Sequence, residues 1–208
     1  MNIKKTANLL INFTIKRLAE IFGVIIFSGG VILLIALITY SPDDPNFIFP
    51  ENTKIKNLLG FQGSFVSDLF FQSIGLIAYL VSFTFIVTGI NIFRIKEFFL
   101  IVENIFFTII YCLFGTLFLT HFYSKGFTLY INGNGGFVGN YLNQTFFGSL
   151  IQLNETIFYY FLILLISFLF LISINFNPKS FYFISKKFFN FLLKKSEKNY
   201  TDKSEIIN

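Results

Sequence analysis

Four long apolar segments divide the chain, and polar or charged residues separate them. The segments cover residues 21–40, 72–93, 104–121 and 156–174, and none of them contains Asp, Glu, Lys or Arg. Their apolar residues form unbroken runs, unlike the alternating pattern of a β-barrel strand. A bilayer core of about 30 Å requires roughly 20 helical residues, and backbone groups in lipid must be hydrogen-bonded within their own segment. The pattern therefore predicts four transmembrane helices.

The composition also favours lipid as the solvent. Hydrophobic residues make up 54% of the chain and charged residues only 13%, against about 25% charged residues in soluble proteins. We therefore expect an all-α integral membrane protein. Its predicted parts are a basic N-terminus (1–20), a four-helix transmembrane domain (21–174) and a basic tail or the start of a linker (175–208).

The positions of Lys and Arg predict the orientation of the chain. Thirteen of them lie in the N-terminal flank, the loop at 94–96 and the C-terminal tail, whereas the two opposite loops hold only Lys54, Lys56 and Lys125. Cytoplasmic loops of membrane proteins carry the excess of Lys and Arg. Both termini are therefore predicted to be cytoplasmic.

The tail after the fourth segment alternates lysines with aromatic and aliphatic residues. Asn177-Pro178 is expected to end the fourth helix, and residues 179–198 place apolar side chains near helical spacing. This pattern is typical of a basic juxtamembrane helix that lies on the inner membrane surface. A positive-inside flank followed by a solvated linker explains it equally well, and both interpretations stay open.

The two outer loops contain turn signals followed by amphipathic segments. In the first loop the prolines stop the helix at Ser41-Pro42-Asp43-Asp44-Pro45. The carboxylates of Asp43, Asp44 and Asp68 are expected to cap helices or face water. Short amphipathic segments at 64–71 and 137–147, each led by glycines, are predicted to lie at the membrane interface.

An offset of 73 residues overlays the two outer loops. It places Gly63, Leu69, Gly75 and Leu80 on Gly136, Leu142, Gly148 and Leu153. One interpretation is a repeated unit of span, glycine-led segment and span. Chance identity in a biased composition is the other.

Small residues mark two candidate packing positions. Gly75, Ala78, Ser82 and Gly89 are predicted to share one face of the second span, and Gly135 and Gly139 have the four-residue spacing that allows close helix approach. Packing within one four-helix bundle and packing between subunits are both compatible with these residues.

Candidate catalytic chemistry is sparse. Cys112 and His121 are the only cysteine and histidine, so no His/Cys cluster of metal-ligand spacing exists in the sequence. The chain lacks the Gly-x-x-x-x-Gly-Lys-Ser/Thr string of a phosphate-binding loop. We therefore expect no enzymatic activity and no cofactor. The net charge of +5 does not predict DNA binding by this chain, because its lysines flank membrane spans.

The order of these features resembles the N-terminal four-helix membrane domain of the FtsK/SpoIIIE family of bacterial DNA translocases. The resemblance covers residues 21–174. Its most specific element is the turn at 41–45, where Pro replaces the usual aromatic residue. The other residues that carry it are Gly60, Gly63, Asp68, Gly75, Arg94, Gly135, Gly136, Gly139 and Gly148.

The resemblance implies an anchor in the bacterial inner membrane, enriched at the division septum. Its expected partners are the lipid bilayer, membrane proteins of the division machinery and further copies of the chain. ATP and DNA would be bound only by a motor domain that this sequence does not contain, so the chain is expected to be the anchor of a longer protein or a shortened homologue. A small multi-pass transporter or channel subunit is the alternative.

Overall fold

The computed structural model describes residues 3–45, 54–124 and 132–179, together with residues 182, 186, 187 and 190. It divides the chain into two units, residues 1–175 and residues 176–208. Most of the predicted basic helix at 179–198 lies outside the described residues.

Within the described residues, four helical segments are long and apolar enough to cross a membrane: Asn8–Ile38, Gly60–Ile95, Phe99–Phe122 and Glu155–Ser173. They confirm the predicted fold class of four transmembrane helices. The first belongs to α1 (Ile3–Ile38), the third is α4 (Phe99–Phe122) and the fourth is α7 (Glu155–Ser173). The second contains α2 (Gly60–Ile74), the 3-10 turn η1 (Gly75–Ile77) and α3 (Ala78–Ile95).

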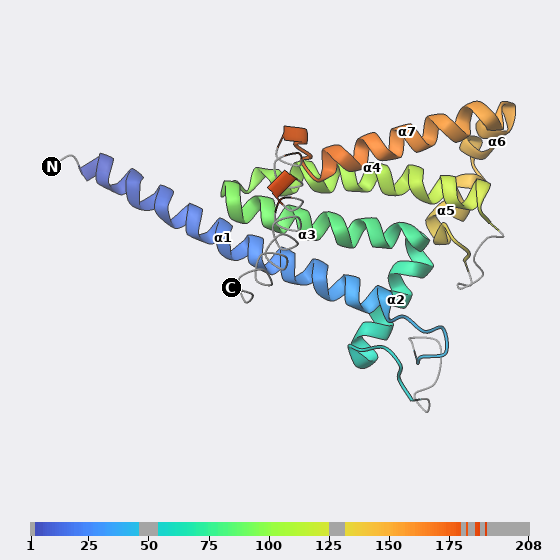
Figure 1. Cartoon of the computed structure of the whole chain (residues 1–208), viewed down its shortest axis with the longest axis horizontal. Helices are drawn as coiled ribbons and strands as arrows, with labels where there is room; N and C mark the ends of the chain where they lie inside the picture. The colour runs from blue at the N-terminus through green and yellow to red at the C-terminus, as the bar shows by residue number, and fades with distance from the viewer. Residues whose placement is uncertain are drawn as a thin grey trace, which may run out of the picture. The chain divides into compact units, whose positions relative to one another are not determined.

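The long helices of the first unit lie side by side in the order α1, α3, α4, α7 (Figure 1). Two short helices, α5 (Gly136–Asn143) and α6 (Phe146–Leu153), lie between α4 and α7 in the sequence. Three apolar clusters hold these elements together. They are centred on Leu37 and Phe71, on Val81 and Tyr111, and on Leu117 and Leu162.

Helix α1 begins well before the predicted span at residue 21, because the charged residues near that boundary do not interrupt the helix. Glu20 forms ion pairs with Arg17, at 2.6 Å, and with Lys96 just after α3, at 2.5 Å. The Glu20–Lys96 pair ties α1 to the end of α3.

Three glycines allow α1 and α3 to approach closely. A Cβ atom added to Gly23 would lie 2.7 Å from Phe93 N, and one added to Gly30 would lie 2.8 Å from Ile86 N. One added to Gly89 would lie 2.7 Å from Gly23 O. Small residues of this kind let the backbones of membrane helices come into contact. We call Gly23, Gly30 and Gly89 the glycine seam.

The predicted second span is not one continuous helix. Gly75 has φ +59° and begins the 3-10 turn that separates α2 from α3. The sequence predicted that Gly75 shares a helical face with Ala78, Ser82 and Gly89. Because Gly75 lies before the start of α3, it does not belong to that face. Ala78 and Ser82 are fully buried in α3, and Gly89 packs against α1.

The end of the fourth helix also differs from the prediction. Helix α7 ends at Ser173, and Asn175 adopts the left-handed region with φ +50°. Asn is one of the few residues that enter this region readily. The helix therefore ends before Asn177-Pro178.

Candidate functional site: the outer cap

The end of the bundle predicted to face outward is built from residues 39–45, 54–77 and 132–153, which we call the outer cap. It contains the acidic turn, most of the candidate glycines and the helices α2, α5 and α6. Most of the residues that the sequence singles out come together here.

Asp44 organises the first half of the outer cap from a buried position. Only 2% of the residue is exposed, and its two carboxylate oxygens accept the backbone N–H groups of Lys56 and Asn57, each at 2.8 Å. The expectation was that this carboxylate caps a helix or faces water, and it does neither, because Lys56 and Asn57 precede α2. A charged carboxylate is stable in a buried position where several hydrogen-bond donors point at it. Here the backbone N–H groups of Lys56 and Asn57 are those donors.

Asp43 and Asp68 have different surroundings. Asp43 is exposed and forms an ion pair with Lys56 at 2.8 Å. This contact holds the pKa of Asp43 below its usual value and raises the pKa of Lys56. Asp68 is 8% exposed and accepts a hydrogen bond from the Tyr40 hydroxyl at 3.0 Å. It ties α2 to the end of α1, whereas the sequence predicted that it would cap a helix or face water.

Asn57 connects the acidic turn to the helices on either side. Its Nδ2 donates to Ala36 O at 2.9 Å, and its Oδ1 accepts the N–H of Leu59 at 3.0 Å. A Cβ on Gly63 would collide with this Oδ1 atom. Gly63 is therefore required for the turn to pack on α2. From the turn itself, Pro45 O accepts the hydroxyl of Ser64 at 3.1 Å.

The second half of the outer cap joins the two outer loops. The N–H of Leu76 donates to Asn134 O at 2.9 Å. At this crossing Gly75 and Gly136 have φ +59° and +66°. A Cβ on Gly136 would lie 2.6 Å from Ser73 O, and one on Gly75 would collide with the Asn134 carbonyl. Glycine is therefore required at both positions, for space and for backbone conformation.

The spaced glycines Gly135 and Gly139 form a close helix contact although they lie outside the long apolar helices. Both pack on α4, where a Cβ on either residue would collide with Thr116 O and with the Thr120 hydroxyl. The segment is therefore a fixed contact between α5 and α4.

The 73-residue overlay does not pair residues of equal conformation. Gly75 breaks a helix, whereas Gly148 lies inside α6 and packs closely on Asn143. Gly63 lies inside α2, whereas Gly136 begins α5. The order of span, glycine-led segment and span does occur twice, with different local geometry.

His121, in the last turn of α4, contacts the outer cap through Asn143. Its Nδ1 lies 2.8 Å from Asn143 Oδ1, and its Nε2 lies 3.9 Å from Glu155 Oε1. These contacts join α4 to α5 and to the start of α7. Among the residues that the structure describes, no group of three His, Cys, Asp or Glu side chains is placed to hold a metal ion.

Comparison with known proteins decides the family. The family model described as the 4TM region of DNA translocase FtsK/SpoIIIE matches residues 15–179, which include most of α1 and all of α2 to α7. The chain belongs to this family. The match confirms the resemblance found from the acidic turn and the glycines, and it identifies the chain as a multi-pass membrane domain of the FtsK type.

Two relatives of this FtsK-type domain carry the name DNA translocase FtsK. The protein from Caulobacter vibrioides is 35% identical over 73 residues, which cover 35% of this chain and 9% of the relative. The protein from Rickettsia typhi is 36% identical over 62 residues, which cover 30% of this chain and 8% of the relative. The matches thus span less than a tenth of these relatives. No solved structure matches the chain.

Several residues that build the outer cap of this FtsK-type domain were not among the predicted site residues. They are Tyr40, Lys56, Asn57, Asn132 and Asn134. The recurrence of Asn beside glycine and proline turns could have identified the asparagines, because Asn side chains bind nearby backbone groups in turns. Their distant partners could not be inferred from sequence order alone.

Proposed function

We propose that this chain is a non-catalytic membrane anchor that brings an FtsK-type DNA translocase to the division septum of the bacterial inner membrane. The family match over all four membrane helices is the observation that carries the proposal. Restricting a motor to the membrane plane raises its local concentration and favours its assembly without any chemistry in the anchor. ATP hydrolysis and DNA contacts belong, in this proposal, to a motor outside this sequence.

The outer cap is the proposed contact surface for membrane proteins of the division machinery. Its backbone is fixed by the buried Asp44 and by the crossing of Leu76 and Asn134. Exposed apolar side chains, including Leu58, Phe137 and Tyr141, project from the same region. A rigid backbone that presents apolar and aromatic groups suits a protein partner, because such groups supply most contact energy at interfaces. Association with further copies of the chain is part of the same proposal.

Localisation in dividing cells tests this function. A fluorescent protein fused after Asn208 is expected to concentrate at midcell. The D44N variant, which weakens the outer cap, is expected to stay in the membrane but lose midcell enrichment. E103Q, which removes one carboxylate from an exposed position of α4 outside the outer cap, serves as the control that retains it. Uniform envelope fluorescence of the unmodified chain, at normal abundance, would contradict septal targeting.

A small transporter or channel subunit remains the alternative function. Buried polar groups between the helices support the anchor, because they bond to each other: Asn104 donates to Thr88 at 2.9 Å, and Thr84 lies 3.0 Å from the Tyr111 hydroxyl. Such pairs tie membrane helices together. Flux of ions or small solutes in proteoliposomes above the empty-vesicle level would favour the alternative.

A further inference from the structure

Polar side chains gather where the chain leaves α7 and lies against α3 and α4. Asn91 Nδ2 donates to Ile174 O at 3.0 Å, and Asn175 Nδ2 donates to Asn104 Oδ1 at 2.7 Å. Asn104 in turn donates through its own Nδ2 to the Thr88 hydroxyl at 2.9 Å. We call Asn91, Asn104 and Asn175 the asparagine clasp. It joins the residues just after α7 to both neighbouring helices.

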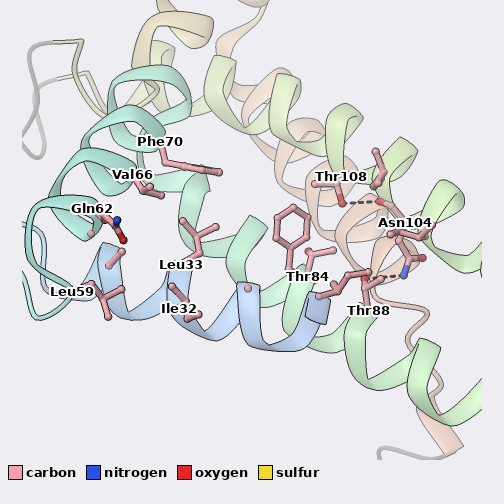
Figure 2. A pocket seen from close by; sticks show the side chains of 17 residues that line it. Ile32, Leu33, Leu59, Gln62, Val66, Phe70, Thr84, Thr88, Asn104 and Thr108 are labelled. Atoms are coloured by element: carbon pink, nitrogen blue, oxygen red, sulfur yellow. Dashed lines mark hydrogen bonds between the residues drawn. The ribbon is translucent and has the colours of Figure 1, made fainter. Parts of the chain in front are cut away.

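Asn104 is the fixed centre of the clasp. Only 1% of Asn104 is exposed, and Thr88 is buried beside it. The Thr108 hydroxyl donates to Asn104 O at 2.6 Å. Figure 2 shows Asn104 between Thr88 and Thr108, with both hydrogen bonds drawn as dashed lines. Because its neighbours hold Asn104 in place, its Oδ1 atom is already oriented to accept the amide of Asn175.

The backbone leaves the helix bundle at the clasp. Helix α7 ends at Ser173, and Asn175 adopts φ +50°. The last carbonyl groups of a helix have no partner within that helix, and Asn91 supplies a donor for Ile174 O. Asn175 is also the last residue of the first structural unit. A pull on the residues that follow it therefore reaches the bundle at the clasp.

Between its ends, α7 packs on α4 through apolar side chains. Leu162 and Leu169 are buried in α7, and they belong to the clusters that contain Leu117 and Tyr111 of α4. When two membrane helices separate, lipid chains replace such apolar contacts with equivalent ones. A broken amide hydrogen bond finds no replacement in hydrocarbon. The clasp is therefore the contact that resists separation at this end of α7.

We propose that the asparagine clasp is a mechanical fastening that resists a pull on the C-terminal tail. The inference rests on the proposed function, because a motor that moves DNA exerts an equal and opposite force on its anchor. The tail that begins at residue 175 would transmit this force as a linker. Force applied there separates α7 from the bundle beginning at its last turn, so the hydrogen bonds of Asn91 and Asn175 are loaded first.

Two substitutions open the clasp with little change to the backbone. N91A removes the donor to the carbonyl after α7. N175G removes the donor to α4 and keeps the left-handed conformation, which Gly adopts without strain. T84V is the matched control, because the Thr84 hydroxyl lies 3.0 Å from the Tyr111 hydroxyl and links α3 to α4 outside the clasp. It removes one buried interhelical hydrogen bond without changing the contacts of residues 174 and 175.

Constant-force spectroscopy on the full chain in a lipid bilayer tests the fastening. A tag after Asn208 applies the pull to the tail, and in a separate experiment a tag before Met1 applies it to α1. Two average interhelical hydrogen bonds in a membrane correspond to about tenfold in rate. The double variant N91A/N175G should therefore shorten the lifetime of the first rupture under a pull on the tail about tenfold. T84V should leave this lifetime unchanged, and a pull at the N-terminus should not distinguish the double variant from the unmodified chain.

Equal lifetimes of the double variant and the unmodified chain under a pull on the tail would overturn the proposal. So would an equal loss in T84V or under a pull at the N-terminus, because either result would show a general loss of stability. Should the double variant fail to fold, N175G alone provides the same test with about a threefold effect. The measurement requires neither a motor nor a septum, so its failure is distinguishable from a loss of midcell enrichment, which tests the proposed function.

Discussion

Gly29 and Gly30 are neighbours on α1 with opposite surroundings. Gly29 faces open space, whereas a Cβ on Gly30 would lie 2.8 Å from Ile86 N and 3.0 Å from Phe85 Cβ. The substitutions G29A and G30A therefore make the same chemical change in the same helix and differ mainly in what the new methyl group meets. The pair isolates the contribution of the glycine seam.

The expected magnitudes follow from two effects. Replacing Gly by Ala inside a helix stabilises it by roughly 0.5–1 kcal/mol, because Gly loses more conformational freedom on folding. G29A should show this gain. G30A carries the same gain but must also separate α1 from α3, and overpacking of this kind costs about 1–3 kcal/mol. G30A should therefore be less stable than G29A by about 1–3 kcal/mol.

Thermal unfolding in detergent, followed by helical circular dichroism, measures this difference. For a chain of this size, 1 kcal/mol corresponds to a shift in Tm of roughly 2–4 °C. G89A should lie with G30A or below it, because the three atoms nearest to its new Cβ are all backbone atoms of α1. Equal Tm values for G29A and G30A would refute the close packing of α1 on α3.

Three further predictions concern the outer cap. D44N should lower stability by about 2 kcal/mol, since hydrogen bonds to a charged group contribute about 1.5–3 kcal/mol, while D43N should change Tm little because its ion pair is exposed; equal losses would contradict the buried role of Asp44. G75A should cost more than the roughly 1–2 kcal/mol expected for a left-handed residue in open space, which G60A measures, since Gly60 has φ +66° and no neighbour within 4 Å; equal Tm values would contradict the contact with Asn134. Lys56 lowers the pKa of Asp43, so the stabilisation by this pair is present above the unfolded-state pKa of Asp43 and is lost as the pH falls through the lower folded-state value. The small Tm loss of D43N at neutral pH should therefore vanish below about pH 4, and a loss that grows on acidification would contradict the ion pair.

The sequence predicted the four membrane helices well because the signal is long and physically simple. About 20 apolar residues without charge have few alternatives to a membrane helix. Gly89 was identified for its small size, but Gly23 and Gly30, its partners on α1, were not. Which glycine faces another helix depends on helix rotation and pairing, and neither follows from a single sequence.

The outer cap was less predictable because its key contacts join residues distant in the sequence. Nothing in the sequence distinguished Asp44 from Asp43 in the same turn. Only Asp44 is buried, because the backbone N–H groups of Lys56 and Asn57, twelve and thirteen residues later, donate to its carboxylate. Similarly, Gly75 matched a helical face by spacing, but its contact with Asn134 from the other outer loop breaks the helix. The local sequence pattern identified Asp44 and Gly75 as important but could not predict their contacts with residues distant in the sequence.

The central claim is that the chain crosses the membrane four times and holds both ends on the cytoplasmic side. Paired topology reporters at Asn2 and Asn208 test it most directly, with green fluorescent protein as the cytoplasmic reporter and alkaline phosphatase as the periplasmic reporter. We expect fluorescence and no phosphatase activity at both ends. Phosphatase activity at either end would contradict the claim.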